Sequence, residues 1–307
     1  MSNSANQTNE LRSAALLFCT AGIWGFAMAA QREASQYLQP LTFNACRFTL
    51  GALFLLPVML FQDRKTGAGL TRAHIVRGAI LGSVLFLASF LQQSAVGEAG
   101  AGKAGFLTAL YVVMVPVLGV FIGKKTQLTT WLALVLALPA LYLLCVPRGE
   151  RLSLAPSDSL LLLSSVVWAV QILCMDHFVE AVPPLKLCTV QFFAAAALNW
   201  VFALIFEPIS GENLARALVP VLYCGIMSTG VGYLFQAMGQ RGCRPAYAAL
   251  IMSLESVFCV IAGALLLGER MDSRGYIGCA LMLLAVLVAQ AGALRKPREG
   301  REEKAHV

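Results

Sequence analysis

The chain has 307 residues, of which 58% are hydrophobic and 13% are charged, and its mean hydropathy is +0.73. Soluble domains average about a quarter charged residues, so a water-soluble fold of this composition would expose large apolar patches. The net charge of +7 is spread over segment ends and the tail instead of forming one patch, which excludes nucleic acid as an expected partner. We therefore expect an all-α integral membrane protein surrounded by membrane lipid.

Ten apolar stretches follow one another, each close to the 20 or so residues that a membrane-spanning helix needs. Helices are expected because they satisfy their own backbone hydrogen bonds in lipid. Residues 1–11 form a polar cytoplasmic arm that we expect to be disordered, and residues 295–307 form a basic cytoplasmic tail. The predicted spans are 12–31, 40–61, 75–96, 103–123, 128–146, 157–178, 184–206, 215–239, 246–267 and 274–294.

The two halves of the chain repeat one another at a constant offset of 144 positions. The matching pairs include Trp24/Trp168, Pro40/Pro184, Phe48/Phe192 and Gln92/Gln236. Residues 12–146 are therefore predicted to form a first five-helix repeat, and residues 157–294 a second. Near-half repeats in apolar chains are typical of duplicated membrane bundles, most of which are transporters.

Cationic residues set the expected orientation. With the N-terminus in the cytoplasm, the inner segments hold 15 of the 23 Lys and Arg residues and the outer segments hold 7. This bias places both termini inside. Because five spans per half is an odd number, the second half enters the membrane upside down. We therefore predict ten transmembrane helices arranged as two inverted five-helix repeats, with a binding site between the repeats.

Polar and aromatic side chains within the spans are candidates for a substrate cavity, because such residues are costly in lipid without a partner. Several share a helical face, as Trp24 does with Met28 and Gln31, and Trp168 with Gln171. Polar contacts between helices remain an alternative role for each of them. The candidate cavity residues are Trp24, Gln92, Gln93, Tyr111, Trp168, Tyr233, Gln236 and Tyr247.

Three charged residues are candidates for coupling or charge pairing. Glu255 lies near the middle of the ninth span, where it would carry a proton, hold a cationic group of the substrate or anchor a neighbouring helix. Arg47 lies about seven residues into the second span, where a structural role is favoured. Lys103, at the start of the fourth span, would line the outer mouth of the cavity or anchor at the interface.

Two stretches of the sequence resemble the drug/metabolite transporter superfamily, in its EamA-domain family. The first, IWGFAMAAQREASQYLQPLTFNACRFTLGALFLLP, has a Trp-Gly, a Pro before the next span and an Arg-Phe. The second, RPAYAALIMSLESVFCVIAGALLLGER, has a Glu and a closing Leu-Gly-Glu. The chain departs from the family pattern at Ser256, where Pro often follows the Glu, and at Lys124, where the first repeat lacks the closing Glu.

The resemblance implies a ten-helix bundle in a bacterial inner (cytoplasmic) membrane that moves, and often exports, amino acids, small metabolites or drugs. It also implies a cavity built from the first, third, fourth, sixth, eighth and ninth spans. We expect no cofactor and no metal site, a monomer or homodimer, and proton coupling as one option. A non-transporting membrane partner or receptor subunit and an intramembrane enzyme are the alternatives, although the catalytic and ATP-binding motifs sought are absent from the sequence.

Overall fold

The computed structural model describes residues 2–99, 101–124, 126–146, 155–267 and 273–295, and within these ranges it is helical throughout, with no strand. The first half contains α1 (Ser2–Ala34), α2 (Pro40–Thr66), α3 (Arg72–Ala99), α4 (Ala101–Ala109), α5 (Tyr111–Phe121) and α6 (Leu128–Cys145). The second half contains α7 (Pro156–Phe178), α8 (Pro184–Phe206), α9 (Gly211–Arg216), α10 (Leu218–Leu222), the π-helix η1 (Tyr223–Gly232), α11 (Tyr233–Gly242), α12 (Pro245–Met252), α13 (Glu255–Leu267) and α14 (Ser273–Arg295).

Eight helical stretches in the described part of the chain are long and apolar enough to cross a membrane. The two other expected spans, 128–146 and 274–294, contain shorter apolar helices, Leu128–Leu143 and Ser273–Ala289. Residues 2–11 were expected to be disordered, but in the structure they are helical, because α1 already begins at Ser2. No Pro or Gly interrupts the chain before the first span, so the helix continues outward. The tail beyond Arg295 lies outside the described residues.

Prolines and one glycine set the ends of the two central helices. Pro40 and Pro184 are the first residues of α2 and α8, where a missing N–H breaks no helical hydrogen bond. At the other end of α2, Gly67 adopts a left-handed conformation with φ of 67° and donates its N–H to the carbonyl of Asp63. The two prolines therefore allowed the starts of α2 and α8 to be predicted from the sequence.

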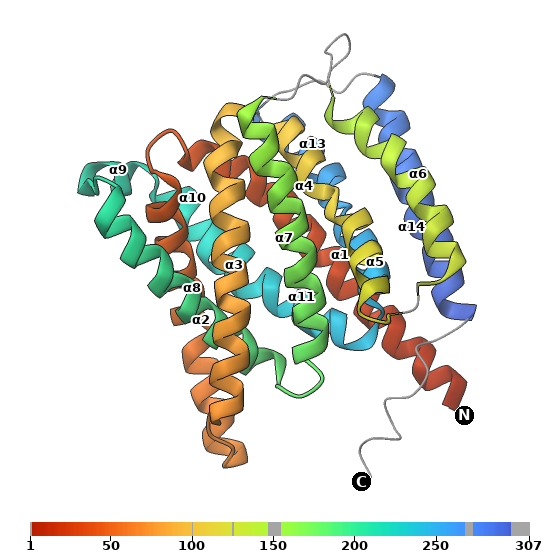
Figure 1. Ribbon diagram of the computed structural model, residues 1–307, viewed down its shortest axis with the longest axis horizontal. Coiled ribbons are helices and arrows are strands. Elements are labelled where there is room, and N and C mark those ends of the chain that lie inside the picture. The colour runs from red at the N-terminus through yellow and green to blue at the C-terminus, as the bar shows by residue number, and fades with distance from the viewer. Residues whose placement is uncertain (1, 100, 125, 147–154, 268–272, 296–307) are drawn as a thin grey trace.

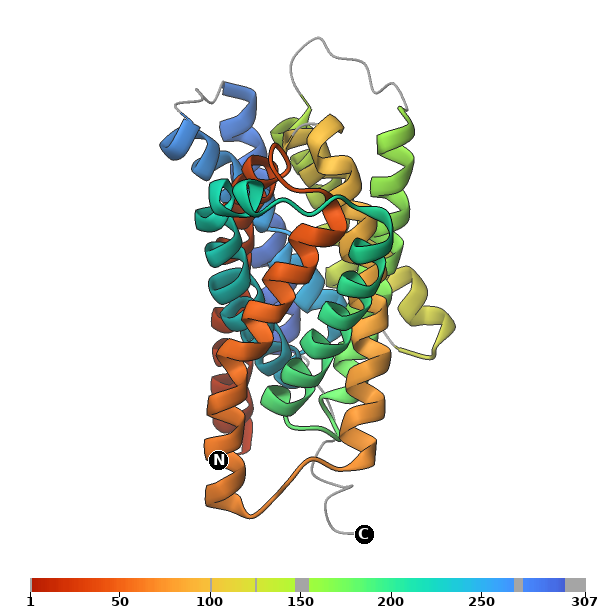
Figure 2. The ribbon, with the colours of Figure 1, turned by 90° about the vertical axis from the view of Figure 1, so that its left-hand side faces the viewer.

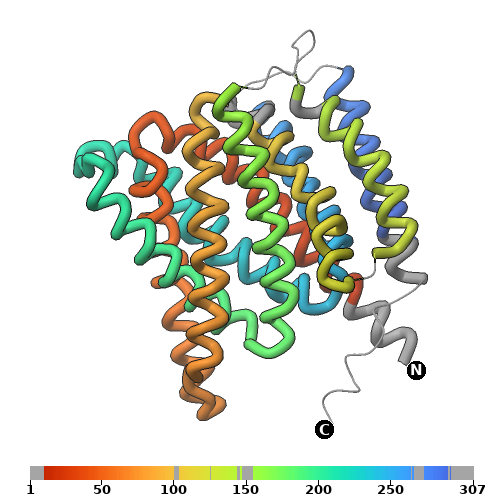
Figure 3. Tube along the Cα trace, in the orientation of Figure 1, coloured from red at the N-terminus to blue at the C-terminus, as the bar shows by residue number. Residues whose placement is uncertain are grey.

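Helices at equivalent positions of the two halves pack against each other. α2 lies along α8, and α6 lies along α14 at one edge of the bundle (Figures 1 and 3). In Figure 1, α2 descends while α8 rises, and α6 rises while α14 descends. Figure 2 turns the α2–α8 pair toward the viewer. The two copies therefore run in opposite directions, and α2 and α8 meet where a two-fold axis would pass.

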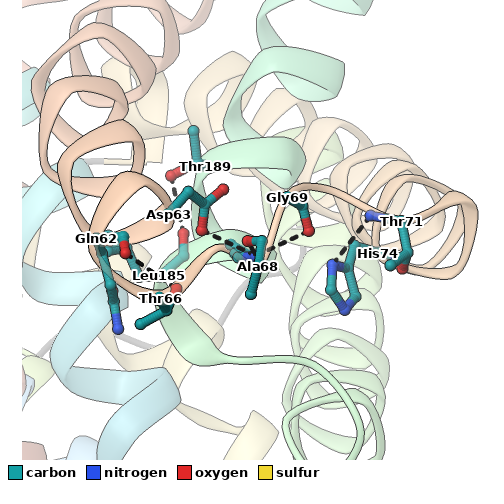
Figure 4. A network of polar contacts seen from close by, with 10 residues as sticks. Gln62, Asp63, Thr66, Ala68, Gly69, Thr71, His74, Leu185 and Thr189 are labelled. Carbon is teal, nitrogen blue, oxygen red and sulfur yellow. Dashed lines mark hydrogen bonds and ion pairs between the residues drawn. The ribbon is translucent and has the colours of Figure 1, made fainter.

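Polar contacts join the two ends of the α2–α8 pair. At the start of α2, the carboxylate of Glu207 accepts the N–H groups of Leu41 and Thr42 at 2.8 and 2.7 Å. At the opposite end, Lys186 lies 2.9 Å from Asp63 and donates to the carbonyls of the loop residues 68 and 69 (Figure 4). These contacts give both helix ends partners for charges and amides that would otherwise be buried alone.

Two of the expected spans are broken near their middle. The fourth span divides at Leu110, between α4 and α5, and the ninth divides at residues 253–254, between α12 and α13. In the second break, the hydroxyls of Ser253 and Ser256 donate to backbone carbonyls of the preceding turn, at 2.7 and 2.8 Å. These side-chain hydrogen bonds compete with the backbone hydrogen bonds of a helix. The breaks are 144 positions apart, so Tyr111 and Glu255 open the second half-helices at equivalent places.

The eighth span contains a stretch with no counterpart in the first repeat. Tyr223–Gly232 forms π-helical turns, whereas the equivalent residues 79–88 belong to the continuous α-helix α3. Close approach accompanies this stretch. A Cβ atom on Gly51 of α2 would lie 2.4 Å from Cγ2 of Thr229, and one on Gly225 would lie 2.6 Å from Cβ of Leu50. Because Gly51 and Gly225 have no side chain, η1 can pack in close contact with α2.

Candidate functional site

A cavity lies between the two repeats and takes residues from both. It contains eight of the eleven side chains singled out from sequence. The pairs Trp24/Trp168, Gln92/Gln236 and Tyr111/Glu255 each bring one residue from each repeat. The lining residues are Trp24, Met28, Gln31, Arg47, Gln92, Thr108, Tyr111, Trp168, Gln171, Ile172, Ser228, Tyr233, Gln236 and Glu255.

Aromatic rings form much of the cavity wall. The ring of Tyr233 lies 4.9 Å from that of Trp24 and 6.3 Å from that of Trp168, measured between centroids. The indole N–H of Trp24 donates to the carbonyl of Ser228 at 3.2 Å. Beneath them, Phe48 and its repeat equivalent Phe192 stack at 6.3 Å. Since equivalent residues contact each other, the cavity lies close to the axis that relates the two repeats.

The amide side chains are partly used within the protein. Gln92 accepts the indole N–H of Trp168 at 3.0 Å and donates to the sulfur of Met28 at 3.4 Å. Gln236 donates to Oε1 of Gln171 at 3.0 Å. This leaves Oε1 of Gln236 and Nε2 of Gln171 buried without a partner in the described structure. The two amides therefore offer one acceptor and one donor to the cavity, beside its aromatic rings and its charged side chains.

Arg47 is almost completely enclosed, with 3% of its surface exposed. Its guanidinium carbon lies 4.6 Å from the ring centre of Phe48 and 5.5 Å from that of Phe43. Within the described residues, its Nε and Nη2 atoms have no hydrogen-bond acceptor and it takes part in no ion pair. The sequence favoured a structural role for Arg47. In the structure, its charge lies beside the cavity and has no counter-charge among the described residues.

Glu255 reaches the cavity from the first turn of α13 and retains intermediate exposure there. The carboxyl group of Glu255 interacts with the hydroxyl of Tyr111, its equivalent in the first repeat. No ion pair joins Glu255 to Arg47 in the described part of the chain. The cavity therefore contains one potential anion and one cation that do not neutralise each other by contact.

Three candidates from sequence lie elsewhere or outside the description. Gln93 does not border the cavity, and its amide donates to the carbonyl of Gln31 at 3.2 Å. Tyr247 borders a second pocket, at the ends of α5, α7 and α12, together with Lys124. The ammonium of Lys124 pairs there with the buried Asp176. Lys103 belongs to α4, and its side chain lies outside the described residues.

Some cavity residues fall outside the candidate list drawn from the sequence. Gln31, Thr108 and Gln171 nevertheless have a signal there, because each is polar and shares a helical face with a candidate. Ser228 had none, since its contribution is a backbone carbonyl within π-helical turns. No group of three His, Cys, Asp or Glu side chains suited to a metal occurs in the part of the chain that the structure describes.

The cavity is narrow in this conformation. The volume of the cavity is about 40 Å³. Space of that size accommodates a few waters, whereas pockets for drug-sized ligands measure about 300–1,000 Å³. A larger molecule must therefore enter by separating the surrounding helices or by turning the side chains that now meet at the centre.

The sequence matches the model of the EamA-like transporter family twice, over residues 11–146 and 155–290. Together these matches cover both repeats. Among similar proteins, an uncharacterized transporter of Archaeoglobus fulgidus is 27% identical over 270 residues, which cover 87% of this chain and 82% of that protein. The uncharacterized transporter YwfM of Bacillus subtilis is 27% identical over 300 residues, or 92% and 94% of the two chains.

Similarity extends to plants and to a solved structure. The WAT1-related protein At5g64700 of Arabidopsis thaliana is 24% identical over 149 residues, which cover 47% of this chain and 42% of that protein. A crystal structure with 20% sequence identity superposes with a TM-score of 0.76 over 93% of this chain and 99% of its own. At that identity the likeness concerns the fold alone. Two of these relatives are named as transporters and none as an enzyme.

Proposed function

Because the chain belongs to the EamA-like transporter family, we propose that it is a secondary transporter that carries a small metabolite or drug-like compound across the inner membrane, as an exporter. In this proposal ten helices cross the membrane as two inverted repeats, with both termini in the cytoplasm. The two shorter apolar helices, Leu128–Leu143 and Ser273–Ala289, then form the fifth and tenth crossings.

The observation that carries the proposal is the composition of the central cavity. Equivalent residues of both repeats meet there, and the lining combines indole and phenol rings with unpaired amide groups. Rings provide apolar contact area, and a few placed polar groups provide selectivity, which is the usual make-up of a small-molecule site. A binding site between inverted repeats at mid-membrane is the arrangement expected of an alternating-access transporter.

The antiparallel arrangement of the repeats supplies a mechanism. The equivalent helices α2 and α8 pack together and run in opposite directions, so the two ends of the bundle are built from equivalent elements. Exchanging the roles of the two repeats would close one entrance and open the other. The narrow cavity suits an intermediate between the two open states, in which the side chains around the centre are in contact.

Glu255 is our candidate for coupling transport to protons. It is a carboxyl group at the cavity wall, and an uncharged tyrosine, Tyr111, replaces it at the equivalent position of the first repeat. A carboxylate without a cationic partner in a water-poor site is costly, and protonation removes that cost. Binding and release of a proton at Glu255 would then alter the charge presented to the cargo.

The proposal is tested by comparing cells that overproduce the protein with cells that carry an empty vector. Excreted metabolites are measured by mass spectrometry, and growth is measured on a panel of toxic compounds. We expect at least one compound to accumulate outside the overproducing cells or to become less toxic. Trp168→Ala should abolish the effect, whereas Leu204→Ala, on an exposed apolar face, should retain it. Equal profiles for wild type, vector and both variants would refute transport of the compounds surveyed.

A further inference from the structure

The guanidinium of Arg47 makes no ion pair with any residue that the structure describes. The residue is seven positions into α2, which corresponds to roughly 10 Å along the helix from its start. A guanidinium remains protonated at all ordinary pH values, so this side chain cannot escape its burial by losing a proton. Two of its nitrogens, Nε and Nη2, are enclosed without an acceptor.

Other buried charges in the described structure are treated differently. The carboxylate of Asp176 is fully buried and pairs with Lys124. The ammonium of Lys186, 8% exposed, pairs with Asp63 and also donates to two backbone carbonyls. The fold therefore supplies partners for these charges at the ends of the bundle. Arg47, which borders the cavity, makes no ion pair among the described residues, and its Nε and Nη2 atoms have no acceptor there.

The protein groups closest in electrostatic terms do not satisfy Arg47. Tyr233 and Cys224 interact with it, and both are neutral donors or weak acceptors at ordinary pH. The rings of Phe43 and Phe48 flank the guanidinium and restrict how it can turn. A fixed, unpaired guanidinium beside a cavity is suited to bind a planar anion through two parallel hydrogen bonds.

We propose that Arg47 binds an anionic group of the cargo, and that this group is a single carboxylate or one of similar size and charge. The inference rests on the proposed transport function, because it assigns a role within the same cavity. One guanidinium balances one negative charge. Glu255 borders the same narrow space, so a polyanion such as a phosphate monoester would bring further negative charge toward a carboxylate. The opposing Glu255 thus favours a cargo with one negative group at one end.

The repeat equivalent of Arg47 strengthens the assignment to cargo binding. That position is Gln191, which is fully buried and does not border the cavity. A charge required for folding the duplicated unit would be expected in both copies. Its presence in one copy gives the cavity a positive side, toward α2, and fixes which end of a bound molecule faces that helix.

The test measures binding to the purified, detergent-solubilised full chain by isothermal titration calorimetry. The probes are two matched pairs, 3-phenylpropionate with 3-phenylpropionamide and leucine with leucinamide, in which an amide replaces the carboxylate. We expect the wild type to bind at least one carboxylate about tenfold or more tightly than its amide. Arg47→Gln should weaken binding of that carboxylate about 10- to 100-fold and leave the amide unchanged. Arg47→Lys should retain part of the preference.

Controls separate a binding defect from a folding defect. Arg216→Gln removes a cation from an exposed pair with Glu212, and it should bind both probes as the wild type does. Thermal unfolding and gel filtration verify that Arg47→Gln remains folded, and the chain already places Gln at the equivalent position 191. Wild-type protein that binds neither carboxylate, or that binds the amides equally well, overturns the proposal. So does an Arg47→Gln variant that keeps the carboxylate preference.

The outcomes for transport and for anion recognition are distinguishable, because titration needs no membrane and no gradient. A carboxylate preference that depends on Arg47, in a protein that changes no compound's excretion, would support the anion site and reject transport. Transport of a neutral or cationic compound, unaffected by Arg47→Gln, would support transport and reject the anion site.

Discussion

Asp63 and Glu207 occupy equivalent positions of the two repeats and act at opposite ends of the same helix pair. Asp63, near the end of α2, pairs with Lys186 at the start of α8. Glu207, at the end of α8, accepts hydrogen bonds from Thr42 at the start of α2. Lys186 and Thr42 are themselves 144 positions apart. The duplicated chain has thus kept a carboxylate at both junctions while exchanging its partner from an ammonium to a hydroxyl and backbone amides.

Replacing Lys186 by Met should destabilise the protein by about 2 to 5 kcal/mol, because it leaves the carboxylate of Asp63 and two loop carbonyls without their donor. The measurement is thermal unfolding in detergent. Arg216→Met serves as the control, since that exposed pair contributes about 0.3 to 0.5 kcal/mol. Equal shifts in the two variants would show that the junction adds no more than a surface pair.

Gly25 should tolerate no side chain, because α1 meets α13 there. A Cβ atom would lie 2.4 Å from Cβ of Phe258 and 2.7 Å from the carbonyl oxygen of Glu255. We expect Gly25→Ala to cost about 1 to 3 kcal/mol and to reduce transport, since relief requires α13 to shift with Glu255. Gly211→Ala has open space around the added atom and should change stability by less than about 0.5 kcal/mol. Unfolding curves that coincide for the two variants would contradict the contact.

Glu255→Gln should remove the dependence of transport on a proton gradient while the protein still inserts and folds. An amide retains the shape and hydrogen-bonding capacity of the protonated acid but cannot release a proton. The measurement is uptake into proteoliposomes with and without an imposed pH difference, using a compound found by the excretion screen. Glu98→Gln, on an exposed site at the end of α3, provides the matched control. Gradient-driven uptake that survives Glu255→Gln would exclude the coupling role.

Trp24→Ala and Gln236→Ala should each weaken cargo binding by about 10- to 100-fold. The first removes the ring that faces Tyr233 at 4.9 Å, and the second removes the partner of Gln171 and a free acceptor in the cavity. Quenching of the remaining tryptophans, titrated with the compound found by the screen, measures the affinity. Trp24→Phe, which keeps a ring, should lose less than Trp24→Ala. Unaltered affinity in both alanine variants would reject their place in the binding site.

Candidate residues of the cavity could be singled out from the sequence, whereas the breaks in the helices that carry some of them could not. Trp24, Gln92 and Gln236 were identified because polar and aromatic residues recur at equivalent places, and the structure brings them to one cavity. Hydropathy, however, is the same for one continuous span and for two half-helices. The breaks at Leu110 and at residues 253–254 were therefore not predicted, although they determine where Tyr111 and Glu255 lie.

Geometry also explains the candidates that lie outside the cavity. Gln92 and Gln93 are neighbours on α3, and consecutive residues of a helix point about 100° apart, so only one of the two faces the centre. Tyr247 is the third residue of α12 and stands eight positions before Glu255, roughly 12 Å away along a helix. Tyr247 therefore borders the pocket at the end of the bundle. Its residue type made it a candidate for the cavity, but its position along the span places it too far from the centre.

The π-helical turns of η1 have a consequence for energetics. Two identical inverted repeats would exchange roles between states of equal free energy that are related by a two-fold rotation. Tyr223–Gly232 departs from α geometry in one copy only, although α3 approaches α8 as closely, since a Cβ atom on Gly82 would lie 2.5 Å from the carbonyl oxygen of Gln191. Without cargo, the proposed carrier would therefore populate one of its two open states more than the other. Its two half-reactions would then proceed at different rates, while the gradients of the cargo and of any coupled ion set the direction of net movement.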